Sequence, residues 1–133
     1  MKTLLLQSLK LLVSVVVGYA VMVLAITLVQ EVFFNGVQIG KTPIWQIGVI
    51  GIGTVLSAFL GGYVSQLINR KHALTPQIIM SAMTVVETIY LISNNITGNP
   101  IWFEIPAELS LIFGIMSGGY YARFRSQNKP QTY

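Results

Sequence analysis

Four long apolar segments alternate with short connections that contain polar residues, glycine or proline. Their limits predict membrane-spanning helices over residues 8–30, 44–69, 76–93 and 105–124, followed by a disordered tail over residues 125–133. The first apolar run is longer than the 7–15-residue core of a signal peptide and has no Ala-x-Ala cleavage site. We therefore expect it to remain as a helix of the mature protein.

The composition agrees with a membrane protein. The 133 residues are 53% hydrophobic and only 9% charged, whereas about a quarter of the residues in a soluble domain are charged. Four crossings of about 20 residues each use most of the chain. We expect an all-α fold, an integral membrane four-helix bundle, formed by a single membrane domain over residues 1–133.

The basic residues mark the ends of the predicted helices. Seven of them fall on one side of the predicted membrane and Lys41 falls on the other, which places both termini in the cytoplasm. This distribution predicts a multi-pass protein of the bacterial inner (cytoplasmic) membrane. The basic helix ends either fix the topology or contact anionic lipid head groups, through Arg70, Lys71, Arg123 and Arg125.

Several function classes lack the residues they need. The chain has no cysteine, a single histidine and, among its four acidic residues, no aspartate. Nucleophilic catalysis, thiolate metal sites and bis-histidine haem therefore have no adequate residue set, and the basic residues form no stripe for nucleic acid. We expect no enzyme activity, no catalytic residue, no cofactor, no metal site and no nucleic-acid partner.

Small residues follow one stripe of the second and fourth segments, and two strings, "FLGGYVSQLINRK" and "GIMSGGYYARFR", repeat a Gly-Gly-Tyr before basic residues. Small side chains let helix backbones approach closely, so helix packing is expected, with a conduit or hinge as the alternative. A phosphate cradle is disfavoured because the glycine pairs lie near helix C-termini. The packing set is Gly51, Ala58, Gly61, Gly62, Ser65, Gly114, Ser117, Gly118 and Gly119.

Glu87 lies inside the third apolar segment, where a carboxyl group is costly and therefore a functional candidate. Either it exchanges protons or cations along a polar path, or it is buried and hydrogen-bonded to a neighbouring helix. Glu104 and Glu108, at the start of the fourth segment, are expected to complement the helix dipole. Four other polar residues share the side of the helix that carries Glu87, namely Gln77, Ser81, Thr84 and Thr88.

The chain resembles a group of uncharacterised small bacterial integral membrane proteins with four helices. The resemblance rests on "VVVGYAV", on the Gly-Gly-Tyr strings with their basic helix ends, and on the Pro-x-Trp of "NPIWFE" before the last helix. Ser65 stands where that pattern has an alanine, and Glu87 lies outside the pattern. The resemblance implies a four-helix topology and implies no activity.

Two functions are open at this point. The leading hypothesis is a non-catalytic subunit that packs through its small-residue faces in a homo-oligomer or with other membrane subunits. The alternative is a transporter or channel that passes protons, cations or a small solute along Glu87. Both hypotheses include membrane lipids as partners.

Overall fold

A computed structural model describes residues 1–70 and 74–129, and within these ranges the protein is all-helical. Helix α1 spans Lys2–Thr27 and continues into a wider π-helical turn, η1, over Leu28–Phe33. Helix α2 spans Ile44–Ile68, α3 spans Thr75–Ser93 and α4 spans Ile101–Gln127. All four long helices are long and apolar enough to cross a membrane.

Proline and residues with a left-handed backbone set the turns between the helices. Pro43 and Pro100 directly precede α2 and α4, and Pro76 lies in the first turn of α3, where its missing N–H has no intrahelical partner to lose. Asn95 and Gly98 adopt φ angles of 52° and 66°. The chain therefore reverses direction within a few residues between α3 and α4.

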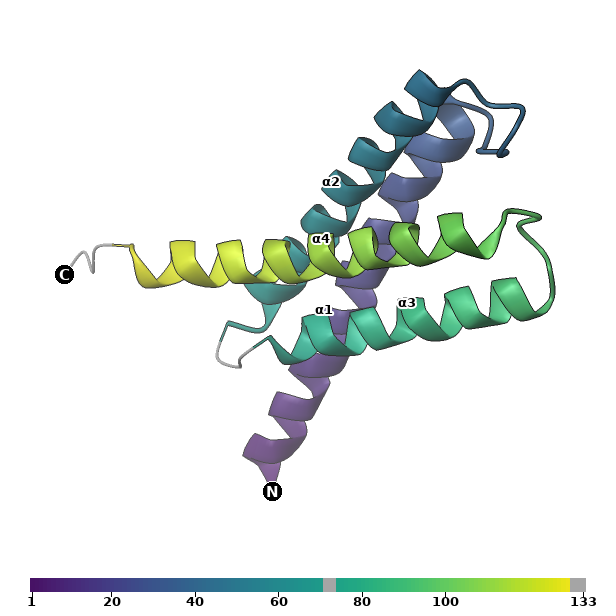
Figure 1. Ribbon diagram of the computed structural model, residues 1–133. Helices are drawn as coiled ribbons and strands as arrows, with labels where there is room; N and C mark the ends of the chain where they lie inside the picture. Colours follow the sequence, from purple (N-terminus) through teal and green to yellow (C-terminus); the bar gives the residue numbers. More distant parts are fainter. Residues whose placement is uncertain (71–73, 130–133) are drawn as a thin grey trace.

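The bundle consists of two antiparallel hairpins that cross each other, α1 with α2 and α3 with α4 (Figure 1). Helix α2 packs against both α1 and α4 and so joins the two hairpins. A small core at the crossing contains Val15, Met22, Ala58, Met80 and Ile115. The ends of the hairpins diverge from this crossing, so space opens between the end of α1 and the start of α4.

Two helices are longer than the membrane spans predicted for them. Helix α1 begins at Lys2 rather than near residue 8, and α4 extends from Ile101 to Gln127 rather than from residue 105 to 124. Hydrophobicity marks the apolar part of a helix, whereas polar helix formers such as lysine, arginine and glutamine extend it beyond that part. The predicted tail is thus helical up to Gln127, and residues 130–133 lie outside the described residues.

The small residues of α2 and α4 lie where the two helix backbones meet. A side-chain methyl group at Gly62 would overlap the carbonyl of Ile115, and one at Gly118 would overlap the carbonyl of Phe59. Gly114 lies against Ala58. A Cβ atom at residue 114 would be 2.8 Å from the Cβ of Ala58. These glycines are what allow α2 and α4 to cross in contact.

The contacts of α1 with α2 and of α3 with α4 also depend on glycine. A Cβ atom at Gly61 would lie 2.7 Å from the carbonyl oxygen of Gly18 on α1, and one at Gly18 would lie 2.6 Å from the Cβ of Ser65. Gly119 lies against the side chain of Gln77 on α3. Most of the predicted packing set is therefore buried inside one chain, whereas Gly51 is exposed and Ser117 is half-buried.

Gln77 provides a first test of the packing. Its side chain is fully buried, its Nε2 donates to the Gly62 carbonyl at 3.0 Å, and its Oε1 accepts no hydrogen bond. In Gln77→Met the lost hydrogen bond, about 1 kcal/mol, is offset by removal of the unsatisfied oxygen, about 1–3 kcal/mol. We expect the variant to be at least as stable as the wild type in thermal unfolding followed by circular dichroism. A loss above about 2 kcal/mol would show that Oε1 has an essential partner.

Candidate functional site

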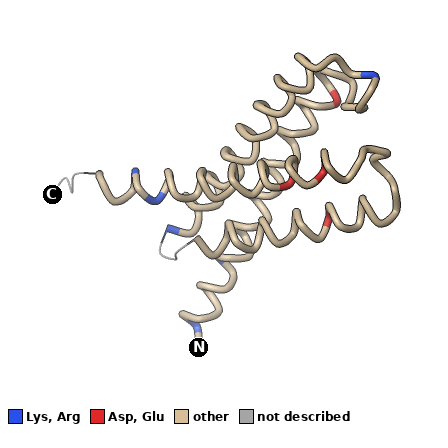
Figure 2. Tube along the Cα trace, in the orientation of Figure 1, with Lys and Arg blue, Asp and Glu red and all other residues tan. Residues whose placement is uncertain are grey.

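A cleft of about 1010 Å³ lies between the diverging ends of the two hairpins. Its walls come from η1 and all four helices. The chain has four acidic residues, and all four line this cleft: Glu31, Glu87, Glu104 and Glu108. Figure 2 shows them gathered toward one side of the molecule, while most basic residues lie toward the opposite helix ends.

Glu108 is the most enclosed of these carboxylates. Its side chain is buried, its Oε1 accepts a hydrogen bond from Thr84 and its Oε2 accepts one from Thr88, each at 2.7 Å. Both donors come from α3, so the three side chains join the two helices of one hairpin. The sequence predicted that Glu108 would act at the start of α4, but the helix begins seven residues earlier, at Ile101, and the side chain turns toward α3.

Glu87 is exposed to the cleft and accepts a hydrogen bond from the hydroxyl group of Tyr19 on α1. This contact spans the gap between the two hairpins. Thr84 and Thr88, which share its side of the helix, donate instead to Glu108. Glu87 and Glu108 are therefore held separately, each by hydroxyl groups, on two different elements of the cleft wall.

The remaining members of the polar face of α3 lie elsewhere. Gln77 is buried between α2 and α4, and neither Gln77 nor Ser81 lines the cleft. The Ser81 carbonyl lies 2.9 Å from Thr84 Oγ1 and shares the single hydroxyl hydrogen of Thr84 with Glu108, and the Ser81 hydroxyl is buried without a hydrogen bond. The polar face of α3 thus divides into a packing part near its start and a cleft part in its second half.

The opposite wall of the cleft is formed by η1 and α2. Gln30 Nε2 donates to Thr54 Oγ1 at 3.2 Å and ties the two elements together. Gly48 and Gly51 of α2 are exposed on this wall, and a Cβ atom at either position would meet nothing within 4 Å. A larger side chain there would therefore extend into open space.

The carboxylate oxygens of the cleft could accept further hydrogen bonds or a positive charge from a ligand. No lysine or arginine among residues 1–70 and 74–129 forms an ion pair with any of them, and one oxygen of Glu104 is buried without a hydrogen bond. Buried acceptors without donors are costly. The aromatic rings of Trp102 and Phe103, in edge-to-face contact, line the same space. The arrangement suits a cation with an apolar body.

The geometry is less suited to a metal ion. Within the part of the chain that the structure describes, no three histidine, cysteine, aspartate or glutamate side chains converge closely enough to hold one. The four carboxylates are distributed over η1, α3 and α4 rather than gathered at one point. Divalent cations require several oxygen ligands at one centre.

The predicted lipid-contacting residues lie at the other end of the molecule. Arg70 and Arg123 line a second, smaller cavity. The Arg125 Nη1 donates to the hydroxyl of Tyr63 at 3.2 Å. Lys71 lies outside the described residues.

Tyr19 escaped the sequence analysis, which also did not predict that Glu108 contacts Thr84. Glu108 and Thr84 lie equally far from Ile96, near the centre of the α3–α4 turn, and equal distance from the turn of a hairpin is a usable signal of contact. Tyr19 lies in the middle of the first apolar segment, where a tyrosine hydroxyl group needs a polar partner. Both signals become visible only when the helix pairing is considered together with the polar positions.

Comparison with known proteins identifies no relative: the chain matches no protein-family model, no curated protein and no solved structure.

Proposed function

We propose that this protein is a multi-pass membrane protein that binds an organic cation in the acid-lined cleft and transports it. The observation that carries the proposal is the convergence of every acidic residue of the chain on one cleft. Charged groups within a membrane segment are costly, and they usually mark the path of a substrate or an ion. An acidic cleft without basic partners attracts a positively charged solute.

The size and lining of the cleft support an organic rather than an inorganic cation. Pockets for drug-sized ligands have volumes of about 300–1000 Å³ and mostly apolar walls, and this cleft has about 1010 Å³. Aromatic rings such as Tyr19 and Trp102 attract cations over their faces. An amine or a quaternary ammonium group on an apolar body combines these requirements.

The orientation of the cleft follows from the basic residues. If the basic helix ends face the cytoplasm, the cleft opens outward and reaches inward as far as Tyr19 and Met22. Its inner limit is the core at the crossing of the hairpins, where Met22, Met80 and Ile115 are almost fully buried. Transport then requires the two hairpins to move against each other at this crossing, as in alternating access.

A blocked cleft tests the transport step. We expect proteoliposomes with wild-type protein to take up methyl viologen, an organic dication, and Gly51→Trp to reduce this uptake at least about tenfold. Gly51 lines the cleft, and a Cβ atom there would meet nothing within 4 Å, so the indole has open space in which to start. The matched control is Leu60→Trp, an exposed position of the same helix that does not line the cleft.

Three outcomes are distinguishable in this uptake assay. Loss of uptake in Gly51→Trp but not in Leu60→Trp supports the cleft as the path. Equal uptake by all three proteins places the path elsewhere and contradicts the proposal. If the wild-type protein takes up no more methyl viologen than empty liposomes do, the proposal of transport is contradicted. Cation binding is a separate claim, which the carboxylate variants test.

A second candidate function is an accessory subunit in a homo-oligomer or a larger membrane complex. It is favoured by the start of α1, where all residues up to Val13 except the half-buried Leu11 are exposed and the helix extends beyond the crossing (Figure 1). Because most of the small-residue stripe packs inside the chain, a partner would contact other exposed apolar surface, of which this segment is one part. Intact mass measurement after gentle extraction separates a lone chain from an assembly.

A further inference from the structure

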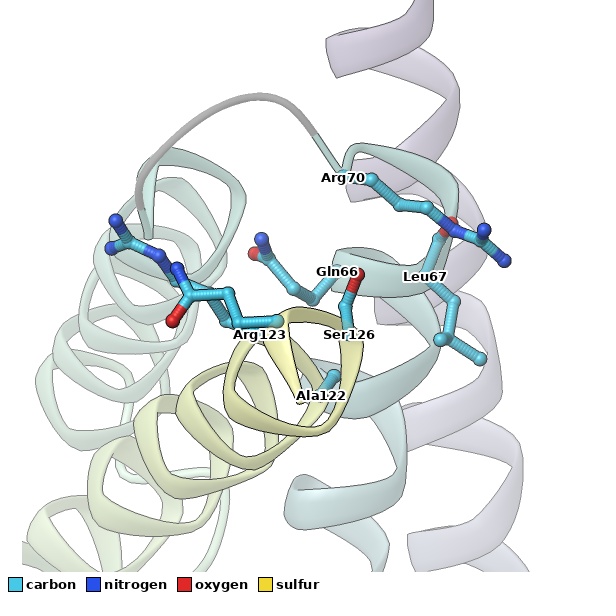
Figure 3. A pocket seen from close by; sticks show the side chains of 7 residues that line it. Gln66, Leu67, Arg70, Ala122, Arg123 and Ser126 are labelled. Carbon is cyan, nitrogen blue, oxygen red and sulfur yellow. The ribbon is translucent and has the colours of Figure 1, made fainter. Parts of the chain in front are cut away.

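A second cavity, of about 150 Å³, lies between the C-terminal ends of α2 and α4, at the opposite end of the molecule from the cleft. Figure 3 shows Gln66 in its middle, with Arg70 and Arg123 on either side. No acidic residue lines it. Its lining residues are Gln66, Leu67, Arg70, Ala122, Arg123, Ser126 and Gln127.

The lining offers hydrogen-bond donors of two kinds. Arg70 and Arg123 supply guanidinium groups, whereas Ser126 supplies a hydroxyl group. Gln66 is only 2% exposed, so it forms a fixed floor rather than a mobile surface side chain. Arg70 donates through Nε to the Leu67 carbonyl at 3.2 Å, which holds the arginine at the rim while its terminal NH₂ groups stay available.

The charge of the cavity is positive in spite of the helix ends. The C-terminus of a helix is equivalent to about half a negative charge, so the ends of α2 and α4 together contribute about one. Arg70 and Arg123 contribute two positive charges. The arginines therefore set the sign, and the loss of either one removes the net attraction for an anion.

We propose that this cavity binds a phosphate group. A phosphate group has the size for such a space, accepts several hydrogen bonds, and is the anion that guanidinium groups bind best. Figure 3 shows both guanidinium groups turned outward, so they reach a ligand in the cavity by a change of side-chain rotamer, which is common at binding sites. Because the cavity lies at the basic ends of apolar helices, the phosphate comes either from a lipid head group or from solution.

The test uses nanodiscs of phosphatidylcholine with a small fraction of phosphatidic acid, and intact mass measurement of the retained lipid. We expect Arg70→Gln and Arg123→Gln each to weaken retention of phosphatidic acid at least about tenfold, as for a lost charge-assisted hydrogen bond. The matched control is Arg125→Gln, which removes a nearby positive charge. Arg125 does not line the cavity, and its guanidinium group donates a hydrogen bond to the hydroxyl of Tyr63. Its effect should stay below about twofold, as for a screened surface charge.

The two sources of phosphate give different results. Retention of phosphatidic acid that excess inorganic phosphate does not displace indicates a lipid head group. Binding of inorganic phosphate in pure phosphatidylcholine nanodiscs, lost in the same two variants, indicates a phosphate from solution. Equal effects of all three arginine variants would overturn the proposal.

Discussion

Gly118→Leu is expected to prevent the two hairpins from crossing. Even a methyl group at this position would overlap the carbonyl of Phe59, and the backbone nitrogen of Tyr63, in the next turn of α2, would lie 2.9 Å from it. Backbone atoms cannot rotate away as a side chain can, so α2 and α4 must separate. Overpacking a core typically costs about 1–3 kcal/mol, and a forced helix separation costs more. We expect a loss of at least about 3 kcal/mol, measured by reversible denaturation in mixed micelles.

The matched control is Gly51→Ala on α2. A Cβ atom at Gly51 meets nothing within 4 Å, and alanine favours a helix over glycine by up to about 1 kcal/mol. This variant should be as stable as the wild type or slightly more stable. If Gly118→Leu instead unfolds at the same denaturant concentration as the wild type, α2 and α4 do not cross in contact and the arrangement of the hairpins is wrong.

Glu108→Gln is expected to weaken the binding of tetraphenylphosphonium, an organic cation, about ten- to a hundredfold. The range corresponds to the loss of one charged interaction, about 1.5–3 kcal/mol, in a partly enclosed site. Glutamine keeps the shape of the side chain and one acceptor for Thr84 or Thr88. The fold should therefore survive, which circular dichroism of the same sample checks. Glu87→Gln is expected to act in the same direction, by about tenfold.

Glu31→Gln is the control for general charge effects. Glu31 is exposed on η1, at the outer part of the cleft wall, where salt screens its charge. Its effect on tetraphenylphosphonium binding should stay below about twofold. If all three glutamate variants weaken binding equally, the cation responds to the overall charge of the protein, and Glu87 and Glu108 form no specific site.

Much of the fold is predictable from the sequence because membrane helices carry strong local signals. The apolar runs indicated all four helices, and Pro43, Pro76 and Pro100 lie at the starts of three of them. The small residues identified the helix faces that approach closely, as Gly62 and Gly118 illustrate. The limits of the helices were less accurate, because polar residues extend a helix without any change in its backbone.

The arrangement of the hairpins and the partners of the carboxylates were not predictable in the same way. Helices that are apolar on all sides give no periodic pattern to show which face turns inward. Close packing of small residues is compatible with several crossing angles. Whether Thr84 donates to Glu87 or to Glu108 depends on the orientation of α3 relative to α4, and no local sequence feature of α3 records that orientation.

The most direct test of the account compares two ions of nearly equal size and opposite charge, tetraphenylphosphonium and tetraphenylborate. Saturable binding of each is measured with the wild-type protein in phosphatidylcholine nanodiscs, after subtraction of the binding to empty nanodiscs. An acid-lined cleft whose carboxylates form no ion pair with a lysine or arginine among residues 1–70 and 74–129 predicts that the cation binds at least about tenfold more tightly than the anion. Equal affinities, or tighter binding of the anion, would contradict the proposal that the cleft selects a positively charged solute.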